Sequence, residues 1–229
     1  MVLLDVGSGP GTITADLAER VAPGRVTALE ISPEVLDTSR AELQRRGVAV
    51  ELVVGDVHDL PLADDSFDVV HAHQVLQHLG DPVGALREMR RVCRTGGVVA
   101  VRDSDYTGFT WWPRLPELDR WLDLYRQAAR ANGGEPDAGR RLLGWAQDAG
   151  FTDITATSST WCFATAEDRA FWGAMWANRI TGSALTEQVL TSSMATKEEL
   201  QALAQGWRRW ASAPDGWLSV LHGELICTP

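Results

Sequence analysis

Three glycines at every second position follow a carboxylate near the start of the chain. Asp5 ends an apolar run, and Gly7, Gly9 and Gly11 come directly after it, before a segment with apolar residues at helical spacing. Glycine permits positive φ and lets a ligand lie against bare backbone N–H groups, and a helix start adds further unpaired donors. The sequence therefore predicts a strand, a tight loop and a helix that cradle a nucleotide-type ligand.

The kind of ligand depends on Asp5 and Thr12. A dinucleotide fingerprint has the spacing G-x-G-x-x-G, and its third glycine would stand at position 12, where this chain has Thr12. A carboxylate in front of the loop also repels a pyrophosphate and attracts a cationic group. We therefore expect a ligand that carries positive charge near Asp5.

Two more acidic residues follow the next predicted strands. Glu30 lies about twenty residues beyond the loop, where a carboxylate can accept hydrogen bonds from both ribose hydroxyls. Asp56 follows Gly55 at the end of a third strand. The plainer interpretations are a solvated loop carboxylate for Glu30 and a turn cap for Asp56. We favour ligand binding, because ligands of parallel sheets lie at such strand ends.

This arrangement resembles the class I S-adenosylmethionine-dependent methyltransferases, in the small-molecule branch that includes the ubiquinone and menaquinone C-methyltransferases. The likeness rests on Asp5-x-Gly7-x-Gly9-x-Gly11, Glu30 and Gly55-Asp56, and it is strong over the first half of the chain. It implies S-adenosyl-L-methionine as cofactor, with its amino-acid part at the glycine loop, its ribose at Glu30 and its adenine at Asp56. The cofactor-binding residues it implies are Asp5, Gly7, Ser8, Gly9, Gly11, Thr12, Glu30, Ile31, Asp56, Val57, His73 and Gln74.

His73 is the candidate catalytic residue. Strand alternation puts His71 and His73 on one side of a strand, with His73 nearest its end. Methyl transfer to a hydroxyl or an activated carbon needs a proton acceptor, and histidine titrates in a suitable range. The alternative is a residue that only touches the methionine part of the cofactor, as related enzymes often have here. We expect His78 to be a helix or packing residue.

Strands and helices alternate through the first hundred residues, which predicts a doubly wound, mostly parallel sheet of the Rossmann-like α/β type. The expected strands after the first are Arg25–Glu30, Ala49–Val54, Phe67–Ala72 and Val98–Val101. Ser32 and Asp81 are expected to open helices that Gly47 and Gly96 end. With two later β segments, Phe151–Ala164 and Trp217–Cys227, the resemblance implies seven strands with an antiparallel edge.

The composition changes after Asp103, because all ten tryptophans lie from Trp111 onward. We expect one methyltransferase domain over 1–229, with a cofactor-binding core at 1–105 and substrate-side helices at 106–229. An insert at 164–213 carries an aromatic stripe at helical spacing. We predict that it forms a helical cap with an apolar acceptor pocket, and a homodimer interface built from the same stripe is the alternative.

The sequence also predicts a helix start and an entrance loop within residues 106–229. Thr196 and Glu199 have the spacing of a capping box. We expect a loop from Tyr106 to Trp112 at the acceptor entrance, with Tyr106 and Arg140 as polar handles for the acceptor.

The composition restricts the partners. The 229 residues carry a formal net charge of −10, which argues against nucleic acid, since its binders need clustered Lys and Arg. Three scattered cysteines have no C-x-x-C pair or zinc spacing, so we expect reduced thiols and no metal site. No apolar run is long enough for a membrane span, and the start lacks a signal peptide, which favours the cytoplasm.

Two other functions remain open at this stage. A regulatory or scaffold protein could bind S-adenosylmethionine in the same fold without turnover, and retained cofactor binding without methyl transfer would indicate it. An NAD-dependent dehydrogenase would bind a dinucleotide, which Asp5 and the loop spacing oppose.

Overall fold

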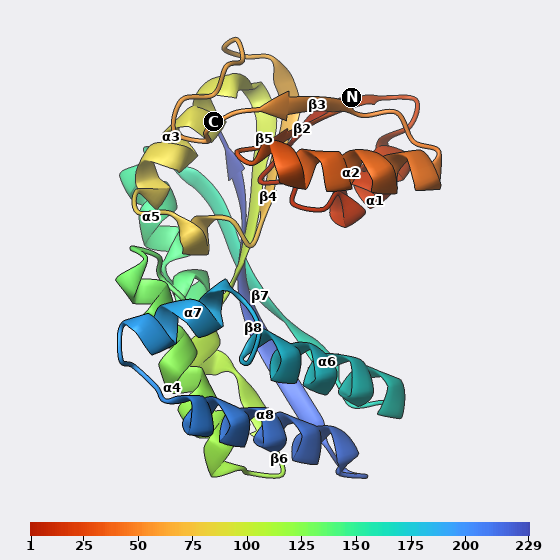
Figure 1. Ribbon diagram of the computed structural model, residues 1–229. Coiled ribbons are helices and arrows are strands. Elements are labelled where there is room, and N and C mark those ends of the chain that lie inside the picture. Colours follow the sequence, from red (N-terminus) through yellow and green to blue (C-terminus); the bar gives the residue numbers. More distant parts are fainter. The chain divides into compact units, whose positions relative to one another are not determined.

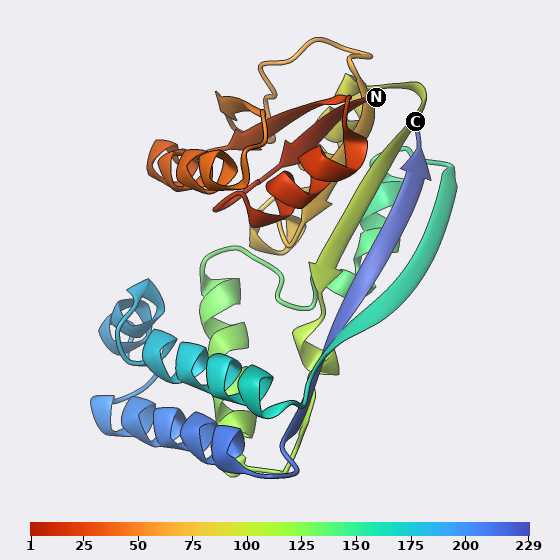
Figure 2. The ribbon, with the colours of Figure 1, turned by 90° about the vertical axis from the view of Figure 1, so that its right-hand side faces the viewer.

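The computed structural model describes all residues from 1 to 229, and they form two compact units (Figures 1 and 2). Unit 1 comprises residues 1–103, 138–158 and 223–229, and unit 2 comprises residues 104–137 and 159–222. Each unit has its own cluster of buried apolar side chains. Two stretches of the half expected to serve the substrate, 138–158 and 223–229, therefore belong to the unit that contains the glycine loop.

Residues of both units form the sheet, whose strand order includes β3-β2-β1-β4-β5-β8, and β7 pairs with β8. The strands are β1 (Val2–Val6), β2 (Arg25–Glu30), β3 (Glu51–Val54), β4 (Phe67–His73), β5 (Cys93–Ser104), β7 (Asp153–Phe163) and β8 (Trp217–Thr228). All pairs from β3 to β5 are parallel, which confirms the doubly wound α/β fold. The register places Asp5 beside Ala28 and His71, so the side chains of Asp5 and His71 lie on one face.

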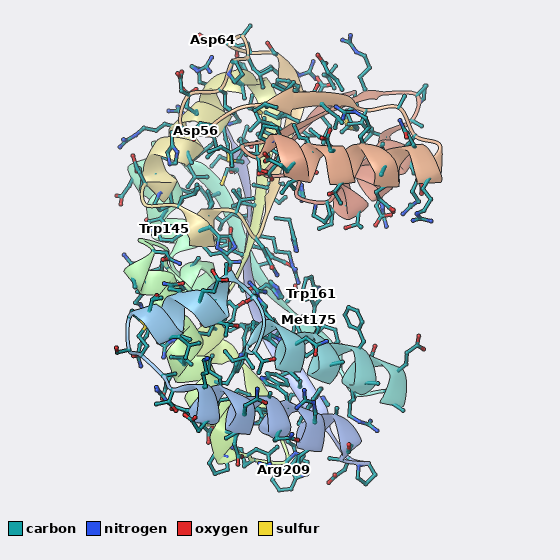
Figure 3. The ribbon with its side chains drawn as sticks, viewed as in Figure 1. Asp56, Asp64, Trp145, Trp161, Met175 and Arg209 are labelled. Carbon is teal, nitrogen blue, oxygen red and sulfur yellow. The ribbon has the colours of Figure 1, made fainter.

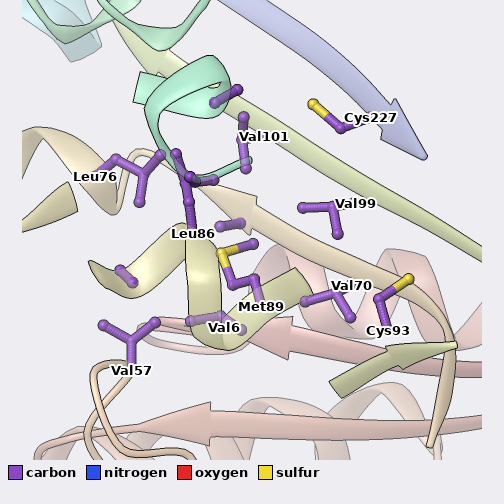
Figure 4. Packing of buried hydrophobic residues seen from close by; sticks show 14 of the residues in the cluster. Val6, Val57, Val70, Leu76, Leu86, Met89, Cys93, Val99, Val101 and Cys227 are labelled. Atoms are coloured by element: carbon purple, nitrogen blue, oxygen red, sulfur yellow. The ribbon is translucent and has the colours of Figure 1, made fainter. Parts of the chain in front are cut away.

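Helices cover both faces of this sheet. The helices α1 (Thr12–Val21) and α2 (Pro33–Arg46) pack together on one face, and α3 (Pro82–Val92) and α5 (Leu142–Asp148) pack together on the other (Figure 1). Strand residues such as Val6, Val70 and Val99 pack with Met89 of α3 in the main core (Figure 4). Burial of a side chain like Met89, which is fully buried, contributes about 1.5–3 kcal/mol.

Most of the predicted helix ends are confirmed. Ser32 caps α2 by accepting a hydrogen bond from the Val35 N–H, and Gly47 ends it at φ 69°. Asp81 caps α3. The predicted end of α3 at Gly96 is wrong: the helix ends at Val92, and the chain enters β5 at once. Cys93 pairs with Phe67, and the register then shifts. Gly96, with φ 76°, therefore lies in the irregular start of β5.

Unit 2 consists of helices around an aromatic core. They are α4 (Pro116–Ala131), α6 (Ala166–Arg179), α7 (Ala184–Thr191) and α8 (Lys197–Ser212). The ring of Trp121 lies edge-on to Trp176 and Trp207, with centroids 4.5 and 4.8 Å apart. Such aromatic pairs add about 0.5–1.5 kcal/mol each beyond the area that they bury. Trp176 and Ile180 of the expected stripe therefore belong to the core of this unit, whereas Phe171 is 66% exposed.

Two predictions for unit 2 need correction. Part of the predicted acceptor loop forms a short strand, β6 (Thr110–Trp112), which pairs antiparallel with β8, so the protein has eight strands instead of seven. It pairs because Trp111 is buried in the core of unit 2. Thr196 caps α8, but the capping box is only half formed: Glu199 bonds to Arg120 at 2.7 Å.

Candidate functional site

A pocket of about 290 Å³ opens in unit 1 where β1, β2 and β4 end. It lies at the carboxyl ends of parallel strands, where doubly wound sheets bind their ligands. Six of the twelve predicted binding residues line it: Gly7, Glu30, Ile31, Asp56, Val57 and Gln74. The remaining six lie outside its lining.

The glycine loop adopts the backbone that its sequence predicts. Gly7, Gly9 and Gly11 have φ of 64°, 54° and 83°. A Cβ on Gly7 would come within 2.5 Å of Val75, and one on Gly11 within 2.4 Å of Ser39, whereas nothing lies within 4 Å above Gly9. Two glycines are therefore required by packing, and the third leaves bare backbone beside open space.

Glu30 is held by backbone donors on both carboxylate oxygens. Its Oε2 accepts from the N–H of Gly9 at 3.1 Å, and its Oε1 accepts from Ile31 at 2.9 Å and Ser32 at 3.3 Å. These bonds fix the orientation of the carboxylate at the end of β2. Oε2 accepts only one of these bonds and has a further lone pair, which a ligand hydroxyl could use.

Asp56 and Val57 form another side of the pocket. The Oδ1 of Asp56 accepts from the backbone N–H of His58 at 2.9 Å and from its ring Nδ1 at 2.8 Å, and these bonds lower the pKa of Asp56. The carboxylate is therefore ionised at neutral pH and is an acceptor. Figure 3 marks Asp56 on the loop after β3. Val57 is 7% exposed, whereas Ile31 is 64% exposed, so these apolar pocket residues differ sharply in burial.

The segment after β4 forms a further wall. Gln74 has φ 56°, an uncommon conformation for this residue, and its N–H donates to the carbonyl of Arg102 at 2.7 Å. The chain then forms the short helix η1 (Leu76–His78). His78 lines the pocket as well as sitting in this helix, a role that the packing interpretation missed. It follows the end of β4 at His73 by five residues, and this nearness to a strand end was the available signal.

The predicted residues outside the pocket lining fall into distinct settings. Ser8 is buried, and its Oγ has no hydrogen-bond partner. Thr12 begins α1, whose start has no side-chain cap. Asp5 is 2% exposed and bonded within the protein. His73 is partly buried, and burial together with the charge of Arg102 lowers its pKa to about 4.

Asp103 is a buried carboxyl group that sequence reasoning placed only at a strand end. It is 0% exposed, and burial raises its pKa to about 7. Its Oδ1 accepts from the backbone N–H of Gln77 in η1 at 3.0 Å, whereas its Oδ2 has no partner. Asp103 therefore supports the wall that carries His78.

Comparison with known proteins identifies the family. Residues 4–101 match the family described as "Methyltransferase domain". An uncharacterized methyltransferase of Schizosaccharomyces pombe is 34% identical over 98% of this chain and 83% of its own length. The chain belongs to the S-adenosylmethionine-dependent methyltransferases. This membership decides against the dehydrogenase alternative.

Two further proteins that this chain resembles are also methyltransferases. The ubiquinone/menaquinone biosynthesis C-methyltransferase of Bdellovibrio bacteriovorus is 36% identical over 43% of this chain and 42% of its own length. Phosphoethanolamine N-methyltransferase 2 of Haemonchus contortus, solved with S-adenosyl-L-methionine, shares the fold with a TM-score of 0.60 at 17% identity, covering 100% of this chain and 49% of that one. The cofactor of this chain is S-adenosyl-L-methionine.

None of the helices of this chain combines the length and apolar character that a membrane span requires.

Proposed function

We propose that this methyltransferase binds S-adenosyl-L-methionine in the pocket of unit 1 and transfers the methyl group to a small, largely apolar or aromatic metabolite. The observation that carries the cofactor assignment is the open space above Gly9 beside the anchored carboxylate of Glu30. The pocket combines bare backbone, carboxylate acceptors and the apolar side chains of Ile31 and Val57, as an adenosyl group requires.

Each part of the cofactor has partners of suitable chemistry in this proposal. The ribose hydroxyls donate to Glu30, and the adenine amino group donates to Asp56 while its ring packs on Val57. The glycine loop with Ser8 and Thr12 binds the amino-acid part, and the unpartnered Oγ of Ser8 supports this placement. Gln74 and His73 lie near the sulfonium.

When bound, S-adenosyl-L-methionine would supply a methyl group on a sulfonium sulfur, and in-line attack of the acceptor on that carbon would displace the thioether. His73 is the candidate general base, the group that takes a proton from the molecule to be methylated. Because its pKa is about 4, the imidazole is neutral at physiological pH and can accept a hydrogen bond or a proton, but it is a weak base. We therefore propose that positioning and exclusion of water contribute more than base strength.

The acceptor class rests on the relatives and on unit 2. The Bdellovibrio relative acts, by its name, in quinone biosynthesis. Unit 2 is rich in aromatic side chains, and Trp112 and Phe171 are 54% and 66% exposed. Tyr106, expected as a polar handle, is 7% exposed and stacks on Phe109 and Tyr125 with ring centroids 4.3 Å away in each case, so it belongs to the core of unit 2 and that expectation is wrong. Arg140 remains the other proposed handle.

The test is transfer of a radioactive methyl group from S-adenosyl-L-methionine to a panel of hydroquinones, phenols, aliphatic alcohols and amines. The proposal predicts labelling of an apolar or aromatic acceptor, and loss of labelling in Glu30→Ala. Cofactor binding without transfer to any acceptor would contradict the proposed acceptor class and favour the regulatory alternative. Labelling confined to amines or to polar aliphatic alcohols would also contradict that class.

Two further expectations belong to this proposal. We propose a cytoplasmic protein that either is monomeric or forms a homodimer through exposed aromatic residues of unit 2, such as Phe171. Light scattering of the wild type and of Phe171→Ser distinguishes these states, because only a homodimer built on this face would lose mass in the variant.

A further inference from the structure

The carboxylate of Asp5 lies beneath the glycine loop, and the protein itself occupies both of its oxygens. The hydroxyl of Thr14 donates to Oδ2 at 2.6 Å, and Nδ1 of His71 donates to Oδ1 at 2.8 Å. Asp5 comes from β1, Thr14 from α1 and His71 from β4. One carboxylate therefore joins three elements that meet at the loop.

This cluster is closed to ligands. The side chain of Asp5 is 4% exposed, and Thr14 is 0% exposed. Neither residue lines the pocket that contains Gly7 and Glu30. The side chain of His71 is 19% exposed and stacks in parallel with His73, with ring centroids 6.5 Å apart.

The cluster also defines the histidine tautomer. A carboxylate oxygen accepts hydrogen bonds, so Nδ1 of His71 is the donor in this pair. A cationic ligand would have to reach a carboxylate that is 4% exposed and is held by donors from α1 and β4. Direct contact would therefore require the protein to open around Asp5.

We infer that Asp5 is a positioning residue, which fixes α1 and β4 around the glycine loop through Thr14 and His71, and that it is not the ligand of the cofactor's ammonium group. The inference rests on the proposed cofactor site and changes the role of one residue in it. It also assigns a role to Thr14 and His71, which hold the loop in the geometry that the cofactor needs.

The test compares two ligands that differ in one group. Calorimetry gives the affinities of S-adenosylhomocysteine and of its desamino analogue, in which hydrogen replaces the amino group. In Asp5→Asn both affinities should fall, while their ratio stays within about twofold of the wild-type ratio. A collapse of the ratio by about tenfold or more in this variant would overturn the inference, because it would show that Asp5 contacts the ammonium.

Variants of the partners give an independent readout. Thr14→Val and His71→Leu should weaken S-adenosylhomocysteine binding as Asp5→Asn does, and His71→Asn, whose amide can replace the Nδ1 donor, should restore it. The control is Asp16→Asn, an exposed carboxylate of α1 that pairs with Arg46. Full affinity in both Thr14→Val and His71→Leu would contradict a positioning role.

A measurement on the wild-type protein tests the inference even if the variants fail to fold. The ¹⁵N spectrum should show His71 protonated at Nδ1, and this signal should persist when S-adenosylhomocysteine is added. Loss of the Nδ1 proton signal on binding would contradict the inference. Failure of the wild type to bind either ligand would instead contradict the proposed cofactor site, a different result from a changed ratio.

Discussion

The backbone N–H of Gly9 donates a hydrogen bond of 3.1 Å to Oε2 of Glu30, which ties the glycine loop to the end of the neighbouring strand β2. The bond couples two features that lie far apart in the sequence. Removing the charge of Glu30 should therefore disturb both the loop and the proposed ribose contact.

Glu30→Gln should weaken S-adenosylhomocysteine binding about 10- to 100-fold, because hydrogen bonds to a charged group contribute roughly 1.5–3 kcal/mol. The matched control is Glu42→Gln, which removes a carboxylate that pairs with Arg45 at the surface of α2. Calorimetric titration of both variants measures the effect. Equal affinities in the two variants would exclude Glu30 from the site.

Gly7→Ala and Gly9→Ala should separate stability from binding. Both positions have positive φ, which costs alanine about 1–2 kcal/mol. Only at Gly7 does a Cβ also collide, with Val75 at 2.5 Å, so Gly7→Ala should lower the melting temperature more. Gly9→Ala should mainly weaken cofactor binding, because its methyl group enters the open space. Thermal unfolding with and without S-adenosylhomocysteine tests this, and a stronger binding defect in Gly7→Ala with an equal loss of stability would contradict it.

Asp103→Asn should change how stability depends on pH. The folded protein raises the pKa of Asp103 from 3.8 to about 7, so its contribution to stability is complete below pH 4 and is lost as pH rises through 7. The variant has no such loss, so relative to the wild type it should gain stability between pH 5 and pH 8, by at most about 3 kcal/mol. Urea unfolding at both pH values measures the difference. The same difference at the two values would show that Asp103 does not titrate in this range.

His73→Asn should change the pH dependence of stability in the opposite direction, because His73 reduces stability at low pH. Folding lowers the pKa of His73 from 6.5 to about 4, so stability is present above pH 6.5 and is lost as pH falls toward 4. The wild type should therefore lose more stability than the variant between pH 7 and pH 5. Parallel unfolding curves check this expectation, and an equal or larger loss in the variant would contradict it.

The sequence was most informative where a local rule determines the structure. The strand, glycine loop and helix at residues 3–21 could be predicted because positive φ requires glycine. Glu30 and Asp56 could be predicted because strand ends converge in a parallel sheet. Both residues do line the pocket.

Other features depend on contacts between distant segments. The early start of β5 follows from pairing with Phe67, and β6 follows from its pairing with β8. The burial of Asp5 depends on Thr14 and His71, and the support that Asp103 gives to the pocket wall depends on Gln77. No local pattern reports these partners, so sequence reasoning could place the residues at strand ends but could not find their bonds.

The most direct test of the cofactor site is calorimetric titration of the wild type and of Glu30→Ala with S-adenosyl-L-methionine, S-adenosylhomocysteine and NAD. We expect the wild type to bind both adenosyl ligands and not NAD, and the variant to bind none of the three. Unchanged binding of the adenosyl ligands to Glu30→Ala, or binding of NAD to the wild type, would contradict the assignment of the pocket lined by Gly7, Glu30 and Asp56.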